Sequence, residues 1–359
     1  MNKNKITHLE GLRGLCCFIV VLDHCVNAFF PELRFTGVSN LQDIIAWSPL
    51  NLIYSGIPSV YIFFILSGFV LSHKYNQKKD NNILVSAAIK RYPRLIIPVF
   101  FSMIIMFIFT WASNELFMTK HILSIEDVFI QSFIYAPFGG GKLSNGVLWT
   151  IVFEIYGSFL VFSALAIFGC YRYKYFIYAI LFFLTFNSNY CLFIFGMALN
   201  SMYNEGISFK LNNKLASYVV LVVSITLMAF PFTRQGVEIG GIYKNLMFLD
   251  SPYENRIILS KIGAMMLFWS MFNLKVLVRF FDTSILQTMG MLSFSVYILH
   301  MPTLQFIRNL NINTSSNIEK LYIMSFLVLS ITIVLSFLFE KFVDRASVKY
   351  TNAFARKVL

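Results

Sequence analysis

The stretch EGLRGLCCFIVVLDHC, residues 10–25, opens the first long apolar segment of the chain and contains two widely spaced ionisable side chains, Arg13 and His24. Because an α-helix turns 100° per residue, eleven steps bring both onto one face, roughly 16 Å apart along the axis. Ionisable groups inside a membrane are costly, and they usually face a bundle interior or a wet cavity where they act. The stretch therefore predicts a membrane helix with a functional face. The alternative is a snorkelling Arg13 and an incidentally packed His24.

The composition is that of an integral membrane protein. The 359 residues are 57% hydrophobic and only 13% charged, whereas soluble domains carry about 25% charged residues. The net charge of +12 does not indicate a nucleic-acid partner, because basic residues of membrane proteins first serve topology. The five cysteines show no metal-ligand spacing, so no metal is expected. No cleavable signal peptide is expected either, because similar apolar segments recur along the chain.

Hydropathy predicts an all-α fold, a bundle of about ten transmembrane helices that forms a single domain over residues 1–359. Each span needs about 20 apolar residues. The fifth and sixth segments are short and are also compatible with one re-entrant hairpin. The predicted spans are 12–30, 56–73, 95–113, 147–169, 174–187, 190–203, 215–232, 256–273, 286–306 and 321–340.

The lysines and arginines of the connections predict the orientation. With the N-terminus inside, 20 of them lie on the cytoplasmic side and 8 outside, and Lys261 lies within a span. This bias places both termini in the cytoplasm, because positive charge favours the inner side. Two outer loops, about 114–146 and 233–255, are long. They are either interfacial segments that rest on the membrane or the place where an acceptor binds.

Three titratable side chains are predicted to share one layer, roughly 10 Å below the outer surface. They are His24 in the first span, Glu154 in the fourth and His300 in the ninth. A carboxylate beside an imidazole fixes its tautomer and raises its basicity, which makes a general base. The alternative is a structural hydrogen-bonded pair that ties helices together.

A basic cluster is predicted at the cytoplasmic start of the third span, where Pro93 is expected in the first helical turn. Arg91 and Arg94 are one helical turn apart and suit a phosphate-bearing ligand, because arginine binds phosphate bidentately. A topological anchor or a site for anionic lipid headgroups is the alternative. In the second span, Ser67 and Gly68 offer a small surface that another helix or a thin ligand could approach.

Together these residues resemble the acyltransferase 3 family, integral-membrane acyltransferases that modify bacterial surface polysaccharides among other acceptors. The resemblance runs from residue 10 to about residue 302, with the motifs in family order. They are Arg13-x10-His24, FFILSGF at 63–69, KRYPR at 90–94, LWTIVFE at 148–154 and GMLSFSVYILHMP at 290–302.

The resemblance implies a multi-pass protein of the bacterial cytoplasmic membrane that uses an acyl-coenzyme A donor, most commonly acetyl-CoA, on the cytoplasmic side. It implies O-acetylation of a sugar hydroxyl, as on O-antigen, capsule or exopolysaccharide. Arg13 and His24 would be essential, and Arg91 and Arg94 would help hold the donor. The donor's pantetheine arm would pass Ser67 and Gly68 to reach His24.

Two mechanisms remain open: His24 deprotonates the acceptor hydroxyl, or it accepts the acyl group itself. Trp149, Tyr297 and His300 are the candidates for stabilising the oxyanion.

The chain departs from the family motifs at four positions. Asp23 precedes His24 and bears on its electrostatics, whereas Thr150, Phe294 and Phe342 are expected to be tolerated. Some relatives carry an additional extracytoplasmic domain that this chain lacks. We therefore expect the acceptor to bind between membrane helices and outer loops, among membrane lipids.

Two alternatives to this function remain. The same chemistry would act on a lipid, a peptidoglycan sugar or a small metabolite. Alternatively, His24 and Glu154 would form a proton relay in a polytopic transporter, although such transporters often show paired halves and no internal repeat is found here.

Overall fold

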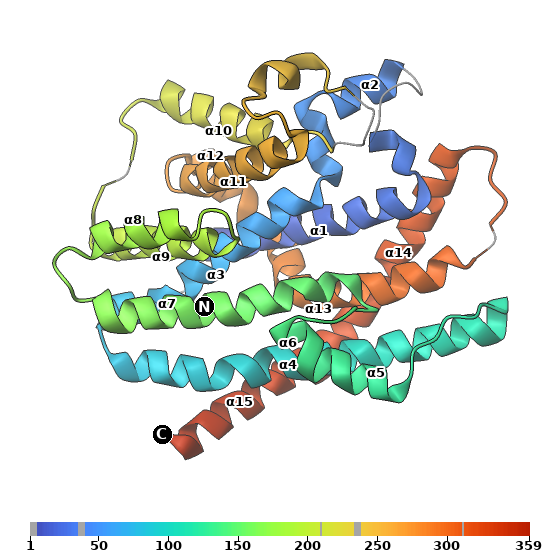
Figure 1. Ribbon diagram of the computed structural model, residues 1–359, viewed down its shortest axis with the longest axis horizontal. Coiled ribbons are helices and arrows are strands. Elements are labelled where there is room, and N and C mark those ends of the chain that lie inside the picture. The colour runs from blue at the N-terminus through green and yellow to red at the C-terminus, as the bar shows by residue number, and fades with distance from the viewer. Residues whose placement is uncertain (1–5, 35–39, 209, 233–237, 311) are drawn as a thin grey trace. The chain divides into compact units, whose positions relative to one another are not determined.

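A computed structural model describes residues 6–34, 40–208, 210–232, 238–310 and 312–359, with the side chains of residues 40–42 left aside. The described part of the chain is helical and contains no strand (Figure 1). The predicted all-α fold is therefore confirmed.

Within the described residues, six helical segments are long and apolar enough to cross a membrane. A seventh is added if two helices bent by 93° at a short break, α11 (Pro252–Ser270) and α12 (Lys275–Phe281), form one span. The six are α1 (Thr7–Phe29), α3 (Gly56–Lys78), α4 (Asn81–Phe117), η4 with α7 (Gly146–Phe168), α13 (Ser284–Arg308), and α14 (Asn317–Phe339) continued through η6 (Glu340–Asp344) and α15 (Arg345–Val358).

The predicted count of about ten spans is not confirmed. The remaining three predicted segments hold α8 (Lys174–Leu184), α9 (Tyr190–Asn204) and α10 (Lys214–Met228), of 11, 15 and 15 residues. At 1.5 Å per residue these helices reach only about 16–22 Å, against a hydrocarbon core of about 30 Å. The location of the termini likewise stays a prediction.

The chain forms two compact units, which we describe separately. Unit 1 comprises Met1–Phe63, Phe209–Met291 and Thr314–Ser325, and unit 2 comprises Phe64–Ser208, Leu292–Asn313 and Phe326–Leu359.

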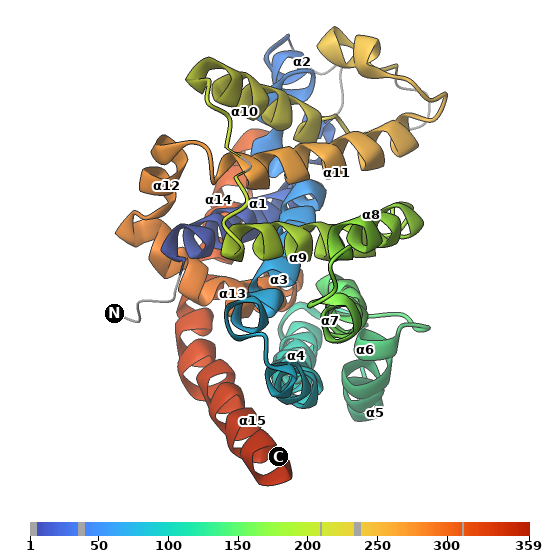
Figure 2. The same ribbon diagram turned by 90° about the vertical axis from the view of Figure 1, so that its left-hand side faces the viewer.

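In unit 1, α10 packs along α11 (Figure 2). The approach is close, because a Cβ atom on Gly263 would lie 2.8 Å from the carbonyl oxygen of Ser224. The short helices η1 (Pro31–Arg34), α2 (Asn40–Ala46) and η2 (Pro49–Tyr54) follow α1, and η2 packs against it. Of the predicted outer loop 233–255, residues 233–237 lie outside the described part of the chain. The rest contains η5 (Gly241–Leu246), whose Tyr243 is fully buried.

In unit 2, α7 packs against α4 and α9, and α8 packs against α9 (Figure 1). Helix α4 begins 14 residues before the predicted span, because the Asp80 side chain caps it by accepting a hydrogen bond from the backbone of Asn82 (2.9 Å). The expectation that Pro93 sets the start of this helix is therefore wrong, since Pro93 lies inside α4.

The outer loop predicted at 114–146 contains three short helical pieces, α5 (Ile125–Ile130), η3 (Gln131–Tyr135) and α6 (Ala136–Phe138). A capping box between Ser124 and Asp127 starts α5. The rings of Phe129 and Phe133 lie 5.2 and 5.3 Å from that of Phe100 on α4. The amphipathic run of this loop is thus packed on α4 by its aromatic side chains.

Candidate functional site

Arg13 lies where α1 meets the first part of α13, within unit 1. Its Nη2 donates to Glu10 Oε2 (2.8 Å) and to the backbone oxygen of Gly290 (2.7 Å). The two helices touch here, because a Cβ atom on Gly14 would lie only 2.5 Å from the backbone nitrogen of Gly290. A glycine pair therefore allows the approach that Arg13 then fixes by its hydrogen bonds.

His24 lies further along α1, and the residue before it is tightly held. Asp23 Oδ1 accepts hydrogen bonds from Arg34 Nη2 (2.7 Å) and from the backbone of Gly56 (3.0 Å). The backbone oxygen of Asp23 also accepts from Arg34 Nη2 (3.0 Å). His24 itself is half-buried and interacts electrostatically with both Asp23 and Arg34. The departure at Asp23 thus brings its own compensating cation, and the turn of α1 that carries His24 is anchored.

In unit 2, Glu154 on α7 is the centre of a charged cluster that also contains Ser67 on α3 and Arg91 on α4. The hydroxyl of Ser67 donates to Oε1 or Oε2 of Glu154, which lie 2.8 and 2.9 Å away, and Arg91 forms an ion pair with Oε2. The side chains of Arg91 and Glu154 are only 12% and 16% exposed, so the pair is largely removed from solvent. Charges removed from water need such pairing to be tolerated.

This cluster joins residues that were predicted in different layers. Glu154 was predicted in an outer layer and Arg91 at the cytoplasmic start of the third span, yet both belong to one cluster with Ser67. The physical reason is that α7 begins beside the middle of α3. Trp149 and Phe153, in the first turns of α7, pack on Phe64 with ring centroids 6.5 and 5.7 Å from it.

The chain is already buried before α7 begins. Asn145 is fully buried and its Nδ2 donates to the backbone oxygen of Ile298 on α13 (2.8 Å). The hydropathy pattern gave no sign of this residue, because an asparagine in a glycine-rich loop is expected in solvent. The buried loop thus places the start of α7 beside α13.

Tyr297 and His300 lie on α13 beside this start of α7. The hydroxyl of Tyr297 donates to the backbone oxygen of Val147 (3.3 Å) or to Thr150 Oγ1 (3.2 Å). Thr150 therefore retains the hydroxyl that the family motif supplies with serine. His300 is fully buried, with Nδ1 3.1 Å from the backbone oxygen of Val296 and its ring 5.9 Å from that of Tyr297.

Gly68 and Arg94, which were both predicted to bind the donor, lie in different surroundings. Gly68 faces α9, because a Cβ atom there would lie 2.0 Å from the backbone oxygen of Phe193. The sequence predicted that either a helix or a thin ligand approaches Gly68. In the structure a helix, α9, approaches it. Arg94 is exposed on α4, in contrast to Arg91.

The structure thus brings together Ser67, Arg91 and Glu154, and it places Arg13 and His24 on one helix. His24 and Glu154 belong to different units, so their predicted contact stays a prediction. The sequence analysis placed Arg34 in an outer loop and did not predict it as the partner of Asp23. The signal that could have indicated this pair is the position of Arg34, just after the first span and eleven residues beyond Asp23. Among the described residues, no group of three or more His, Cys, Asp or Glu side chains is placed to hold a metal ion.

A family model described as an acyltransferase domain, acyltransferase 3, matches residues 6–341, nearly the whole chain. The chain belongs to the acyltransferase 3 family. It is also 34% identical over 101 residues to the O-acetyltransferase PaAT-1 of Phomopsis amygdali. That match covers 25% of this chain and spans only 20% of the length of the relative. No solved structure matches the chain.

Family membership and the apolar helices together indicate a multi-pass membrane protein of the acyltransferase 3 family. The residues predicted from the family motifs lie within the matched region.

Proposed function

We propose that this acyltransferase moves an acyl group, most commonly acetyl, from cytoplasmic acyl-coenzyme A to a hydroxyl of a cell-surface polysaccharide, in a bacterial cytoplasmic membrane. The observation that carries the proposal is the family match over residues 6–341. The relative named as an O-acetyltransferase supports transfer to oxygen. A lipid, a peptidoglycan sugar and a small metabolite are the alternative acceptors of the same chemistry.

His24 is the proposed catalytic residue. In direct transfer, its imidazole takes the proton of the acceptor hydroxyl while the hydroxyl oxygen attacks the thioester carbonyl. The tetrahedral intermediate then expels the coenzyme A thiolate, which recovers the proton from the imidazolium. In the alternative, the imidazole nitrogen first attacks the thioester carbonyl and expels the coenzyme A thiolate. The acceptor hydroxyl oxygen then attacks the acyl-histidine, which restores the imidazole, and the hydroxyl proton passes to the thiolate. In both cases Asp23 and Arg34 hold the turn of α1 that carries His24.

The donor's phosphates are proposed to bind near the N-terminal part of α4. Lys90 interacts electrostatically with three other cations of unit 2, namely Lys74, Arg94 and Arg356. Such a concentration of positive charge suits the phosphates of coenzyme A. Arg91, in contrast, is committed to Glu154, so we assign it to positioning that carboxylate rather than to the phosphates.

The test of this function is mass spectrometry of surface polysaccharide from cells with and without the gene, complemented by variants. His24→Gln keeps a polar side chain, so the protein should accumulate normally while transfer falls by about 10²–10⁴. The matched control is His121→Gln, because His121 is an exposed histidine outside the cluster.

Near-normal acetylation by an abundant His24→Gln variant would remove His24 from the mechanism. An unchanged polysaccharide in cells that lack the gene would remove this acceptor class.

A further inference from the structure

Helix α13 carries a proline in its interior. Pro302 has no N–H, so the backbone oxygen of Ile298, four residues earlier, lacks the hydrogen bond that an α-helix normally gives it. A carbonyl oxygen without a donor is costly inside a membrane, and proline is tolerated in membrane helices because neighbouring groups supply one. The oxygen of Ile298 therefore needs a donor from outside its own helix.

Asn145, in the loop before α7, supplies that donor. Its Nδ2 lies 2.8 Å from the backbone oxygen of Ile298, and both residues are fully buried. A carbonyl oxygen only accepts hydrogen bonds, so the amide nitrogen of Asn145, and not its Oδ1, must face Ile298. The side chain of Asn145 thus replaces the helical hydrogen bond that Pro302 removes.

The residue before Asn145 is bonded on two sides, which holds the amide against α13. The backbone oxygen of Ser144 accepts from Nε2 of Gln305 on α13 (3.1 Å). Its backbone nitrogen donates to Oε1 of Gln131 on η3 (2.7 Å), and Nε2 of Gln131 donates to Ser144 Oγ (3.1 Å). All these residues belong to unit 2. The donor for Ile298 is therefore held in place by the protein itself.

The turn of α13 that Asn145 holds also carries His300. Nδ1 of His300 lies 3.1 Å from the backbone oxygen of Val296. Since that oxygen only accepts, the ring carries a proton on Nδ1. The imidazole is thus oriented by the backbone between Val296 and His300, and Ile298 is the middle residue of that stretch. A backbone shift at Ile298 would turn the ring.

We propose that Asn145 is a positioning residue for acyl transfer, which holds His300 in place by capping the backbone oxygen that Pro302 leaves without a helical donor. The inference rests on the proposed function, because His300 is one of the side chains expected to stabilise its oxyanion. Such a group must be placed accurately, since a displacement of about 1 Å can lower a rate by about 10²-fold. Asn145 acts through α13 and does not touch the reacting atoms.

The first test is a double-variant cycle between Asn145 and Pro302, measured by thermal unfolding of the full-length protein in detergent. Asn145→Ala leaves the oxygen of Ile298 without a donor, and we expect it to lower the melting temperature by about 2–6 °C. Pro302→Ala restores an N–H that can donate to Ile298 within the helix. In that background Asn145→Ala should cost about half as much or less.

Losses that add in full would overturn the proposal, because Asn145 would not then replace the bond that Pro302 removes. If Asn145→Ala does not fold alone, the double variant decides. It should fold, since residue 302 then supplies the donor, and a double variant that also fails to fold would overturn the proposal.

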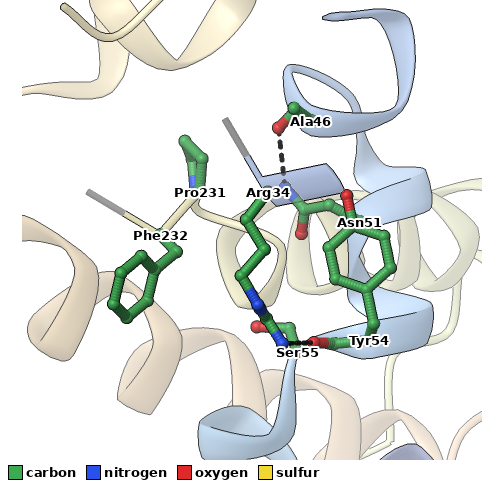
Figure 3. A pocket seen from close by; sticks show the side chains of 7 residues that line it. All are labelled: Arg34, Ala46, Asn51, Tyr54, Ser55, Pro231 and Phe232. Atoms are coloured by element: carbon green, nitrogen blue, oxygen red, sulfur yellow. Dashed lines mark hydrogen bonds between the residues drawn. The ribbon is translucent and has the colours of Figure 1, made fainter. Parts of the chain in front are cut away.

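The matched control is Asn51→Ala in unit 1, because Asn51 is also a buried asparagine whose amide donates to backbone oxygens. Its partners are Ala46 (3.0 Å) and Ala229 (2.7 Å), and Figure 3 shows its amide directed at Ala46. Neither partner lies four residues before a proline. Asn51→Ala should therefore cost the same with Pro302 or with alanine at that position. A loss that shrinks as much as that of Asn145→Ala would overturn the proposal.

The second test separates positioning from a merely structural role. Acetyl-CoA is varied at a fixed concentration of polysaccharide extracted from cells that lack the gene, and rates are divided by the amount of folded protein. We expect Asn145→Ala to lower kcat by about tenfold to a hundredfold and to leave KM for acetyl-CoA nearly unchanged. In a His300→Gln background the same change should have little further effect, because the residue that it positions is gone.

Three results of this test would overturn the positioning role. They are losses of Asn145→Ala and His300→Gln that multiply in full, normal transfer by His300→Gln, and a loss in Asn145→Ala larger than that in His300→Gln. A residue that acts through His300 cannot matter more than His300 itself. Asn51→Ala should show no dependence on His300.

The proposed function can fail separately. A wild-type protein that transfers no acyl group to the polysaccharide would overturn the function, and with it the role of Asn145 in transfer. The unfolding cycle does not depend on transfer and would still report the bond to Ile298. Normal transfer by the wild type, together with unfolding losses that add in full, would overturn the inference alone.

Discussion

Glu154 and Arg91 stabilise each other inside unit 2, and each would be an unpaired buried charge without the other. Replacing Arg91 by glutamine leaves Glu154 with the hydroxyl of Ser67 and no cation. Breaking a buried pair on one side typically costs about 3–5 kcal/mol. We expect Arg91→Gln to lower the midpoint of thermal unfolding in detergent strongly, and the double variant with Glu154→Gln to recover part of the loss. A single variant as stable as the wild type would contradict the pairing.

Arg94 is the natural control and has a prediction of its own. Its side chain is exposed, so Arg94→Gln should leave the unfolding midpoint nearly unchanged. We expect it to weaken acyl-coenzyme A binding instead, by about tenfold or more, since a charge-assisted contact is worth about 1.5–3 kcal/mol. Titration of acyl-coenzyme A into the purified variants measures this. Unchanged binding would return Arg94 to the role of a topological anchor.

At the scale of elements, α3 and α9 are in contact through two glycines. A Cβ atom on Gly68 would lie 2.0 Å from the oxygen of Phe193, and one on Gly196 would lie 2.1 Å from the oxygen of Ile65. Small residues permit such close helix contacts in membrane proteins. Ser67, the neighbour of Gly68, then reaches Glu154. The position of Ser67 therefore depends on this glycine contact.

We expect Gly68→Ala to separate α3 from α9 and to lower stability by about 1–3 kcal/mol, the usual cost of overpacking. Gly146→Ala is the matched control, because its Cβ atom would meet only the end of the Met301 side chain, at 3.8 Å. Thermal unfolding and membrane abundance of the two variants give the comparison. Equal stability of the two alanine variants would show that the helices adjust without cost.

The elements also show what sequence patterns could supply. Apolar run lengths located a helix within every predicted span, and charge inside an apolar segment marked Glu154 as a residue that needs a partner. Arg91, in contrast, was predicted to bind a phosphate-bearing ligand or to anchor the helix, and its ion pair with Glu154 was not predicted. Hydropathy cannot report the level at which a helix begins, however. A buried asparagine, Asn145, and aromatic packing of Trp149 on Phe64 set the start of α7. Glu154 pairs with Arg91 because of where α7 starts, so the sequence patterns could not predict this ion pair.

For the whole molecule, the number of membrane crossings depends on the three shortest apolar helices. Helices α8 and α9 pack together and are joined by a short connection between Leu184 and Tyr190. A helix of 11 residues is too short to span a bilayer of ordinary thickness. The pair therefore crosses only if its ends or the local bilayer adapt; otherwise it forms a re-entrant hairpin. Helix α10, with 15 residues, faces the same constraint alone.

Cysteine labelling can count these crossings, because four of the five native cysteines are buried and only Cys170 is exposed. In a Cys170→Ser background, Lys78→Cys and Glu238→Cys place single exposed thiols before α4 and after α10. Ten spans put an odd number of crossings between them, so an impermeant maleimide added to intact cells should label position 238 and not position 78. Labelling of both would contradict the predicted topology.

Arg172→Cys and Asn187→Cys bracket α8 with exposed positions and resolve the hairpin. We expect them on opposite sides if α8 crosses, with position 172 protected in intact cells and position 187 labelled. Equal labelling of the two would make α8 and α9 a re-entrant hairpin, which leaves the sides of Lys78 and Glu238 unchanged because two crossings are removed together. Labelling of Glu238 then depends on α10 alone. A protected Glu238 would show that α10 does not cross.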